Sequence, residues 1–186
     1  EAAWRRERWT FLVGAAHDVR ATPVTAHTRD DQLETVVMRA MRDPRHTSAR
    51  GLAAMYAARD ARLVARPLLD VTRAELAAYA SAHAVTFVED PTNASCAFLR
   101  NRLRLDLLPA LERASPGFGD AMLRISREAA HWRSGMEAIV DQMGATVLPG
   151  GDVVIGADAL QGLDAASLSA IVPALAARAG IRLDWR

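Results

Sequence analysis

Apolar residues recur every three or four positions through several stretches of the chain, a spacing that places them on one face of an α-helix. Residues 1–19 carry an apolar stripe beside a basic one, and residues 30–42 repeat the apolar spacing. A third amphipathic helix is predicted over 72–83, where Thr72 and Glu75 have the spacing of a capping box. The first half of the chain therefore contains three predicted helices.

Short apolar or β-branched runs separate these helices. They cover residues 24–26, 62–65 and 85–88, and turn-forming residues follow the first and the last of them. Alternation of helices with short buried strands is typical of an α/β protein whose strands are parallel. The pattern predicts such a sheet in the first half of the chain.

From about residue 95 the pattern becomes helical. Ser115-Pro116-Gly117 is a boundary signal, and a long helix is predicted after it, over about 120–143. Residues 152–155 could form one isolated strand after a glycine pair in a hairpin or connector, and a last helix is predicted over 165–179. No internal repeat or low-complexity segment interrupts this order.

The composition is that of an ordinary globular protein. The 186 residues are 51% apolar but only 5% aromatic, so the core must consist largely of Ala, Leu and Val. The single cysteine, Cys96, excludes an internal disulfide framework and fits a reduced cytoplasmic location. No apolar run approaches the roughly 18 residues of a membrane span, so no membrane partner is expected.

All 23 basic residues are arginine, and the net charge is only +1. Without lysine the chain has no Schiff-base nucleophile and no phosphate-loop lysine. Arginine offers a planar fork of donors to phosphates and carboxylates, so contact with nucleic acid is not excluded.

Side chains that could take part in catalysis or binding are concentrated at the start of the second predicted helix. His27 ends a predicted strand, Thr28 and Asp31 resemble a capping box, and His27 and Asp31 are four residues apart. Ligands of open α/β sheets bind at the carboxyl ends of strands, which favours a site here. The alternative is a solvated acidic first turn, which the helix dipole would also favour.

A second cluster is basic. Arg100 and Arg104 are four apart and share a helix face, whereas Arg102 points nearly opposite. Two guanidinium groups on one face can clamp a phosphate or a carboxylate. The alternatives are a solvated basic face or salt bridges to Glu89 and Asp90.

Four motifs occur in one order along the chain: the stretch 26–35, Arg66-Pro67-Leu68-Leu69, the turn 89–93 and the helix 100–104. With these motifs the sequence resembles the tRNA(Ile)-lysidine synthetase family over most of residues 1–113. The resemblance implies part of an adenine-nucleotide alpha-hydrolase-like, Rossmann-like parallel sheet in 1–113, followed by a helical, tRNA-contacting domain in 114–186.

The resemblance also implies a reaction. ATP adenylates a cytidine carbonyl oxygen at the wobble position of tRNA(Ile) with a CAU anticodon, and free lysine then displaces AMP. ATP and Mg²⁺ are the implied cofactors, and a homodimer is compatible with the family. Three residues are expected to be catalytic: His27, Asp31 and Arg100. Four more are expected to bind substrate: Asp30, Glu34, Asn101 and Arg104. No metal ligand can be named. Asn93 is better explained as a turn-forming residue than as a ligand.

The family's phosphate-binding loop, SGGxDS, is not found in these residues. The chain is therefore expected to be an internal piece of a longer protein, unable by itself to release pyrophosphate from ATP. Two alternatives stay open: another ATP-pyrophosphatase that modifies tRNA, and a non-catalytic arginine-rich RNA-binding module. The second would explain the arginines but not the turn that contains His27 and Asp31.

Overall fold

The computed structural model describes residues 2–42, 49–56, 64–88, 95 and 97–179. The predicted helices 1–19, 30–42, 72–83, 120–143 and 165–179 are all present, with ends shifted by one or two residues. The elements in chain order are α1 (Ala2–Asp18), α2 (Arg29–Arg42), α3 (Ala49–Leu52), the 3₁₀ helix η1 (Ala54–Tyr56), α5 (Arg73–Ala82), α6 (Leu99–Arg102), the π-helical turn η3 (Leu103–Leu107), α7 (Leu108–Ala114), α8 (Phe118–Gln142), β1 (Thr146–Val147), β2 (Val153–Val154), the 3₁₀ helix η4 (Ala157–Leu160) and α9 (Ala165–Arg178).

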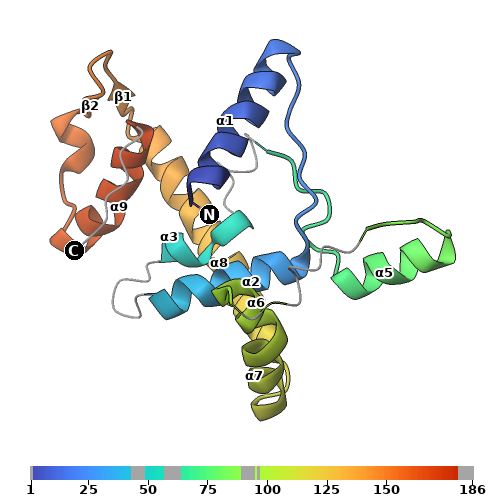
Figure 1. The fold of residues 1–186 in the computed structure, drawn as a ribbon. Coiled ribbons are helices and arrows are strands. Elements are labelled where there is room, and N and C mark those ends of the chain that lie inside the picture. Colours follow the sequence, from blue (N-terminus) through green and yellow to red (C-terminus); the bar gives the residue numbers. More distant parts are fainter. Residues whose placement is uncertain (1, 43–48, 57–63, 89–94, 96, 180–186) are drawn as a thin grey trace.

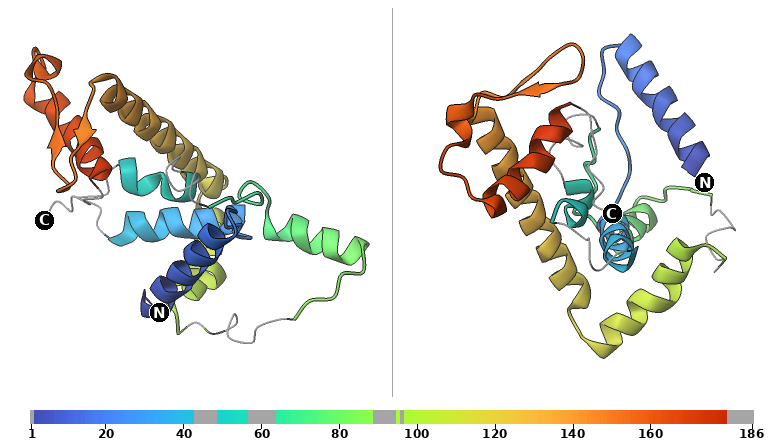
Figure 2. Two further views of the ribbon diagram at one scale, coloured as in Figure 1. Left: turned by 90° about the horizontal axis from the view of Figure 1, so that it is seen from above. Right: turned by 90° about the vertical axis from the view of Figure 1, so that its left-hand side faces the viewer.

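Helices α2, α3 and α8 form the centre of the molecule (Figure 1). Val36 of α2, Ala53 and Leu123 of α8 have 0–2% of their surface exposed, and the small Ala129 and Ala130 let α8 approach Ala53 closely. Helices α1 and α5 extend away from this centre (Figure 1), and the left view of Figure 2 shows the same for α5. The centre therefore fixes α2, whose first turn carries the candidate chemistry.

A buried polar network joins the three central segments. The Gln32 side chain is fully buried in α2. Its amide nitrogen donates to Ser126 Oγ at 2.8 Å and to the Ala53 carbonyl at 3.2 Å, and its Oε1 accepts from the Met55 backbone N–H at 2.9 Å. Because buried amides are costly without partners, this network fixes the register of α2 against α8.

Helix α2 begins with the predicted capping box. The Asp31 backbone N–H lies 3.3 Å from Thr28 Oγ1, while the Thr28 backbone N–H donates to Asp31 Oδ2 at 2.8 Å. Helix α5 begins in the same way at Thr72 and Glu75, as predicted. Helix α5 has no buried residue, so it is more exposed than its apolar spacing indicated.

The described residues do not form the predicted parallel sheet. Their parallel pairing is one isolated bridge between Val24 and Ala65. Thr25 N–H donates to the Ala65 carbonyl at 3.0 Å, and Ala65 N–H donates to the Pro23 carbonyl at 2.9 Å. This pairing joins two of the segments predicted as strands, although residues 62 and 63 lie outside the described residues. The fold shown is mixed α/β and mostly helical.

The prediction of a strand over 85–88 is wrong. These residues are exposed and belong to no strand, and Val88 is 96% exposed. A β-branched run indicates a strand only where a neighbouring strand pairs with it and covers one face. The motif 89–93 that follows lies outside the described residues.

The carboxyl-terminal part contains the one described sheet. Residues 146–147 pair antiparallel with 153–154, so the strand predicted as isolated belongs to a hairpin that turns at Gly150 and Gly151. Val140, Ile171 and Ala174 pack helix α9 against the end of α8. The boundary signal lies at Gly117, whose φ of +85° turns the chain between α7 and α8. Because α8 packs on both α2 and α9, the division into domains at residue 113 stays a prediction.

Candidate active site

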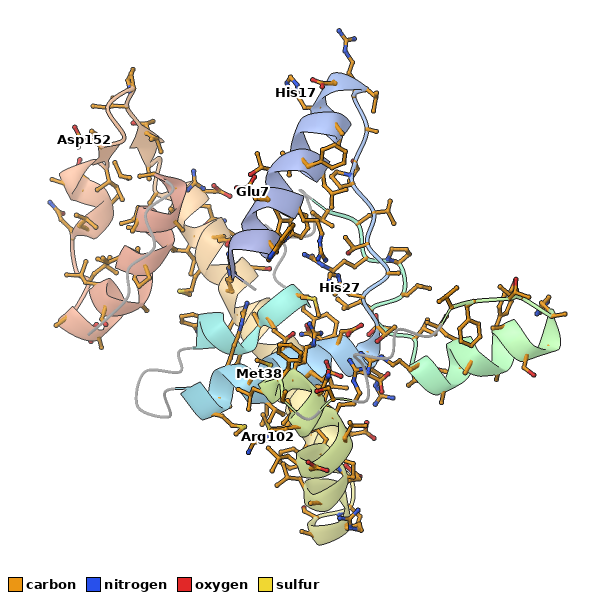
Figure 3. The ribbon with its side chains drawn as sticks, in the orientation of Figure 1. Glu7, His17, His27, Met38, Arg102 and Asp152 are labelled. Atoms are coloured by element: carbon orange, nitrogen blue, oxygen red, sulfur yellow. The ribbon has the colours of Figure 1, made fainter. Side chains whose placement is uncertain are left out.

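Helix α2 presents carboxylates from its first two turns toward three other segments. Asp30, Asp31 and Glu34 lie within five residues, and the capping box fixes the backbone that carries them. The cations that face them come from α5, α6 and η3. They are Arg73, Arg100 and Arg104. Figure 3 shows His27 on the extended segment that leads into α2.

Glu34 is the most deeply buried member of this carboxylate–arginine cluster, with 1% of its side chain exposed. Its Oε1 accepts from Arg104 Nε at 2.8 Å and from an Arg73 terminal nitrogen at 3.0 Å. Its Oε2 accepts from Arg100 Nε at 2.6 Å. A buried carboxylate needs such compensation, and here three guanidinium groups supply it.

Asp31 divides its two oxygens between two functions. Oδ2 accepts from the backbone N–H and the hydroxyl of Thr28, both at 2.8 Å. Oδ1 accepts from terminal nitrogens of Arg73 at 2.6 Å and Arg100 at 2.9 Å. Helix capping and cation binding therefore use different oxygens of one side chain.

Asp30 completes the cluster through the backbone. Its Oδ2 accepts from the Arg73 backbone N–H at 2.8 Å, so Asp30 satisfies an amide in the first turn of α5. Three carboxylates face three guanidinium groups, and the formal charge of the cluster is zero. The three arginine side chains are 29–33% exposed, so solvent and ligands can reach them.

The pKa values of the two central carboxyls are lowered. Burial alone would raise the pKa of Asp31. The hydrogen bonds from Thr28 and the charges of Arg73 and Arg100 outweigh this effect, so the pKa lies below its ordinary value. Burial also raises the pKa of Glu34, and its hydrogen bonds to Arg104 and Arg100 with the charge of Arg73 outweigh that effect. Both groups are ionised at neutral pH.

The structure brings together most of the predicted site residues. Asp31 contacts Arg100 directly, and Glu34 and Arg104 join the same cluster. Arg100 and Arg104 do share a face, whereas Arg102 is exposed. Their salt bridges reach Asp31 and Glu34; the alternative partners Glu89 and Asp90 lie outside the described residues.

Two predicted residues lie beside the cluster. His27 Nδ1 is 2.8 Å from Thr25 Oγ1, which orients the ring just before α2. Asn101 donates from Nδ2 to the Ser95 carbonyl at 2.8 Å. The contact of Asn101 is therefore to the chain that precedes α6.

Sequence reasoning missed Arg73. Its acidic partners are 39 and 42 positions away, so helical spacing could not connect them. One signal was available: three carboxylates near the start of one helix favour nearby cations, and Arg73 opens a helix whose capping box the sequence already indicated.

A cavity of about 200 Å³ borders the cluster at Asp30 and Thr72. Arg29 and Glu112 also line it, and Arg29 forms an ion pair with Asp120 there. Among the described residues no group of three or more His, Cys, Asp or Glu side chains could hold a metal ion. Asp31 and Glu34 already face guanidinium cations, which is an unfavourable setting for a divalent cation.

Fold and site thus combine a mostly helical α/β chain with an ionic cluster in which arginines from α5, α6 and η3 pair with carboxylates in the first two turns of the capped helix α2. Comparison with protein families matches residues 1–111 to the PP-loop domain. The chain belongs to the PP-loop domain family. Among the helices that the structure describes, none combines the length and hydropathy that crossing a membrane requires.

The chain is also similar to proteins named tRNA(Ile)-lysidine synthase, as the resemblance predicted. It is 41% identical to the one from Bradyrhizobium diazoefficiens over 143 residues, which cover 75% of this chain and 38% of the relative. It is 38% identical to the one from Salinispora tropica over 182 residues, covering 96% and 51%. The one from Rhodopseudomonas palustris is 41% identical over 145 residues, covering 76% and 40%. The chain spans about a third to a half of the length of these relatives.

Proposed function

We propose that this chain contributes to a tRNA(Ile)-lysidine synthetase, an enzyme that joins lysine to C2 of the wobble cytidine of tRNA(Ile). ATP first adenylates the C2 carbonyl oxygen and releases pyrophosphate. The ε-amine of free lysine then attacks C2, the bond from C2 to the AMP oxygen breaks, and the amine loses its proton. A cytoplasmic location accompanies this function.

One observation supports the proposal most strongly. Asp31 and Glu34, on the helix that follows His27, meet Arg100 and Arg104 from the other motif of the resemblance, across 66 to 70 positions of sequence. Two distant motifs that share one ionic cluster are expected of a functional site. The names of the relatives supply the reaction class.

The chemistry of the cluster suits a substrate that carries both charges. Lysine has a carboxylate, which a guanidinium fork binds in two-point fashion, and an ammonium group, which an ionised carboxylate attracts. We assign the anion-binding role to Arg100 and Arg104. We assign to Asp31 and Glu34 the attraction and orientation of the amine.

The lowered pKa of Asp31 refines its proposed role. A carboxylate with a lowered pKa is a weak proton acceptor, so orienting the ammonium suits it better than removing the proton in a rate-limiting step. His27 lies just before the same helix, and a neutral imidazole can accept a proton. We propose His27 as the group that receives the proton.

The other predicted binding groups have smaller roles in the proposal. Asp30 holds the first turn of α5 in place through the Arg73 N–H, and Asn101 fixes the chain before α6. Mg²⁺ would enter with the phosphates of ATP. The described residues do not form a site for it, and no step is assigned to it.

The arginine contacts disfavour the non-catalytic alternative. An arginine-rich RNA-binding module would account for Arg100 and Arg104, but it has no use for the buried Glu34 that pairs with both of them. Another PP-loop enzyme that modifies tRNA is the remaining alternative. It would accept a nucleophile other than lysine.

The test is product formation by the protein expressed from its complete gene. Incubated with ATP, Mg²⁺, lysine and a tRNA(Ile) transcript with a CAU anticodon, it is expected to release pyrophosphate and to add lysine to the wobble cytidine, measured by mass spectrometry of nuclease digests. Pyrophosphate release without a lysine adduct would point to the other PP-loop enzymes. No release with any tRNA would overturn the proposal. Sedimentation of the same preparation measures whether it is a homodimer.

A further inference from the structure

Arg73 occupies a different position from the other two arginines of the cluster. Its guanidinium group bridges the carboxylates of two residues one helical turn apart, with bonds of 2.6 Å to Asp31 and 3.0 Å to Glu34. Its own backbone N–H donates to Asp30 at 2.8 Å. One residue therefore contacts all three carboxylates of the first turns of α2.

The backbone around Arg73 is also held in place. Thr72 caps α5 with a complete capping box, and the Arg29 N–H donates to the Val71 carbonyl at 2.9 Å. The start of α5 and the start of α2 are thus bonded to each other by backbone as well as side chains. These bonds fix the backbone of Arg73 and so restrict the positions that its guanidinium group can reach.

Arg100 and Arg104 are held less firmly by their own segment. The N-cap of α6 is Phe98, which makes no side-chain capping bond, and α6 has only four residues before the π-helical turn that contains Arg104. A π-helical turn has less regular backbone bonding than an α-helix and is frequent at functional sites. The anchors of Arg100 within the cluster are its bonds to Asp31 and Glu34.

We propose that Arg73 is a positioning residue of this site: it holds Asp31 and Glu34 in place from α5, while Arg100 and Arg104 exchange between those carboxylates and the anionic group of the substrate. The identity of that substrate rests on the proposed function. When an anion recruits Arg100, Asp31 and Glu34 lose part of their compensation. Arg73 remains and keeps both carboxylates ionised and oriented.

The groups that face the two carboxylates come from every segment packed against them. They are Thr28 before α2, Arg73 at the start of α5, Arg100 in α6 and Arg104 in η3. Removal of the Arg73 charge raises the pKa of both carboxyls, because the remaining groups no longer outweigh burial to the same extent. The acid limb of a reaction that needs them ionised then moves to higher pH.

The experiment compares the wild type with Arg73→Ala and Arg73→Lys, each expressed from the complete gene. Lysidine formation is measured against pH, and kcat and KM for lysine and tRNA are determined. Arg73→Ala is expected to lower kcat by on the order of 10²-fold through displaced carboxylates, with little change in KM for tRNA. Its acid limb is expected at higher pH than in the wild type.

Arg73→Lys separates charge from geometry. An ammonium group keeps the charge but cannot span two carboxylates as the planar guanidinium does. Its acid limb is therefore expected at the wild-type pH, with kcat still reduced. A wild-type kcat in Arg73→Lys, or an unchanged acid limb in Arg73→Ala, would overturn the positioning role.

A control variant outside the cluster and a direct titration of the carboxyl groups test the same role without relying on activity alone. Arg127→Ala removes an arginine that pairs with Asp70 at 3.0 Å outside the cluster, and it is expected to leave the pH profile unchanged. Carboxyl titration by NMR in the same proteins should move Asp31 and Glu34 to higher pH only in Arg73→Ala. If the wild type makes no lysidine but this titration shift is present, the proposed function fails and the positioning of the carboxylates stands.

Discussion

Arg100 Nε donates to Glu34 Oε2 at 2.6 Å across 66 positions of sequence. The bond fixes the short helix α6 to the side of α2, and it does so at a carboxylate with 1% of its side chain exposed. Because two further arginines donate to Glu34, this carboxylate is where the segments on either side of residues 89–94 meet. Substitution of Glu34 therefore tests the architecture and the site together.

Glu34→Gln is expected to lower the free energy of unfolding by about 3 kcal/mol. Glutamine preserves the shape but leaves three arginines without their common anion, and breaking a buried ion pair costs about 3–5 kcal/mol. We take the lower end because the guanidinium groups are about one-third exposed and partly solvated. Urea unfolding followed by circular dichroism measures the change.

Glu137→Gln is the control for this substitution. Glu137 pairs with Arg133 at 3.0 Å within α8, four residues away and partly exposed. Such pairs contribute about 0.3–0.5 kcal/mol, so its effect should be several-fold smaller. Equal losses in the two variants would mean that the Glu34 cluster contributes no more than a surface pair.

Acid is expected to destabilise the protein through the same cluster. The pKa values of Asp31 and Glu34 are lowered in the folded state, so the unfolded state binds protons first as the pH falls. Their contribution is complete above the ordinary carboxyl range, near pH 4.5, and is lost as the pH falls through the lower folded values. Unfolding free energies between pH 3 and 7 should show this decline, and Glu34→Gln should reduce its slope. A slope equal to that of the wild type would contradict the assignment.

The local parts of this fold could be predicted from sequence, because the information lies within a few residues. Thr28 with Asp31 and Thr72 with Glu75 start two helices, and the bonds that make them span three positions. The strand over 85–88 could not be judged in this way. A strand forms only where a neighbouring strand pairs with it, and the local pattern of apolar residues does not reveal whether such a neighbour exists.

Only part of the ionic cluster could be predicted from the sequence, for a related reason. The shared face of Arg100 and Arg104 follows from their spacing of four residues, and both do reach Glu34. Arg73 has no such neighbour in sequence, because its partners lie in α2 and its position follows from how α5 docks on the start of that helix. Contacts that depend on docking require the structure.

Gln32→Leu is expected to cost about 2 kcal/mol of unfolding free energy. Leucine fills nearly the same volume, but the Met55 N–H loses the Gln32 oxygen that it bonds at 2.9 Å. A buried donor left without a partner costs about 1–3 kcal/mol. Gln142→Leu, at the exposed end of α8, is the control and should change stability little. Chemical unfolding compares the two, and a neutral Gln32→Leu would show that the network contributes nothing net.

The last prediction separates the two functions of Asp31. Asp31→Asn removes the negative charge that faces Arg73 and Arg100, while Thr28→Val removes the hydroxyl of the capping box and leaves that charge in place. Both variants weaken the start of α2, which typically costs about 1 kcal/mol for a lost cap. In the proposed function only the first impairs chemistry.

Asp31→Asn is therefore expected to reduce the rate of lysidine formation by on the order of 10²-fold, because the group that attracts and orients the reacting amine loses its charge. Its affinity for tRNA should stay nearly unchanged, because the proposed partner of Asp31 is the amine of lysine and not the tRNA. Thr28→Val should keep most of its rate. Single-turnover assays beside tRNA binding titrations measure both quantities in the protein expressed from its complete gene. If the two variants lost rate equally, the contribution of Asp31 would be the start of the helix, and its role toward lysine would be refuted.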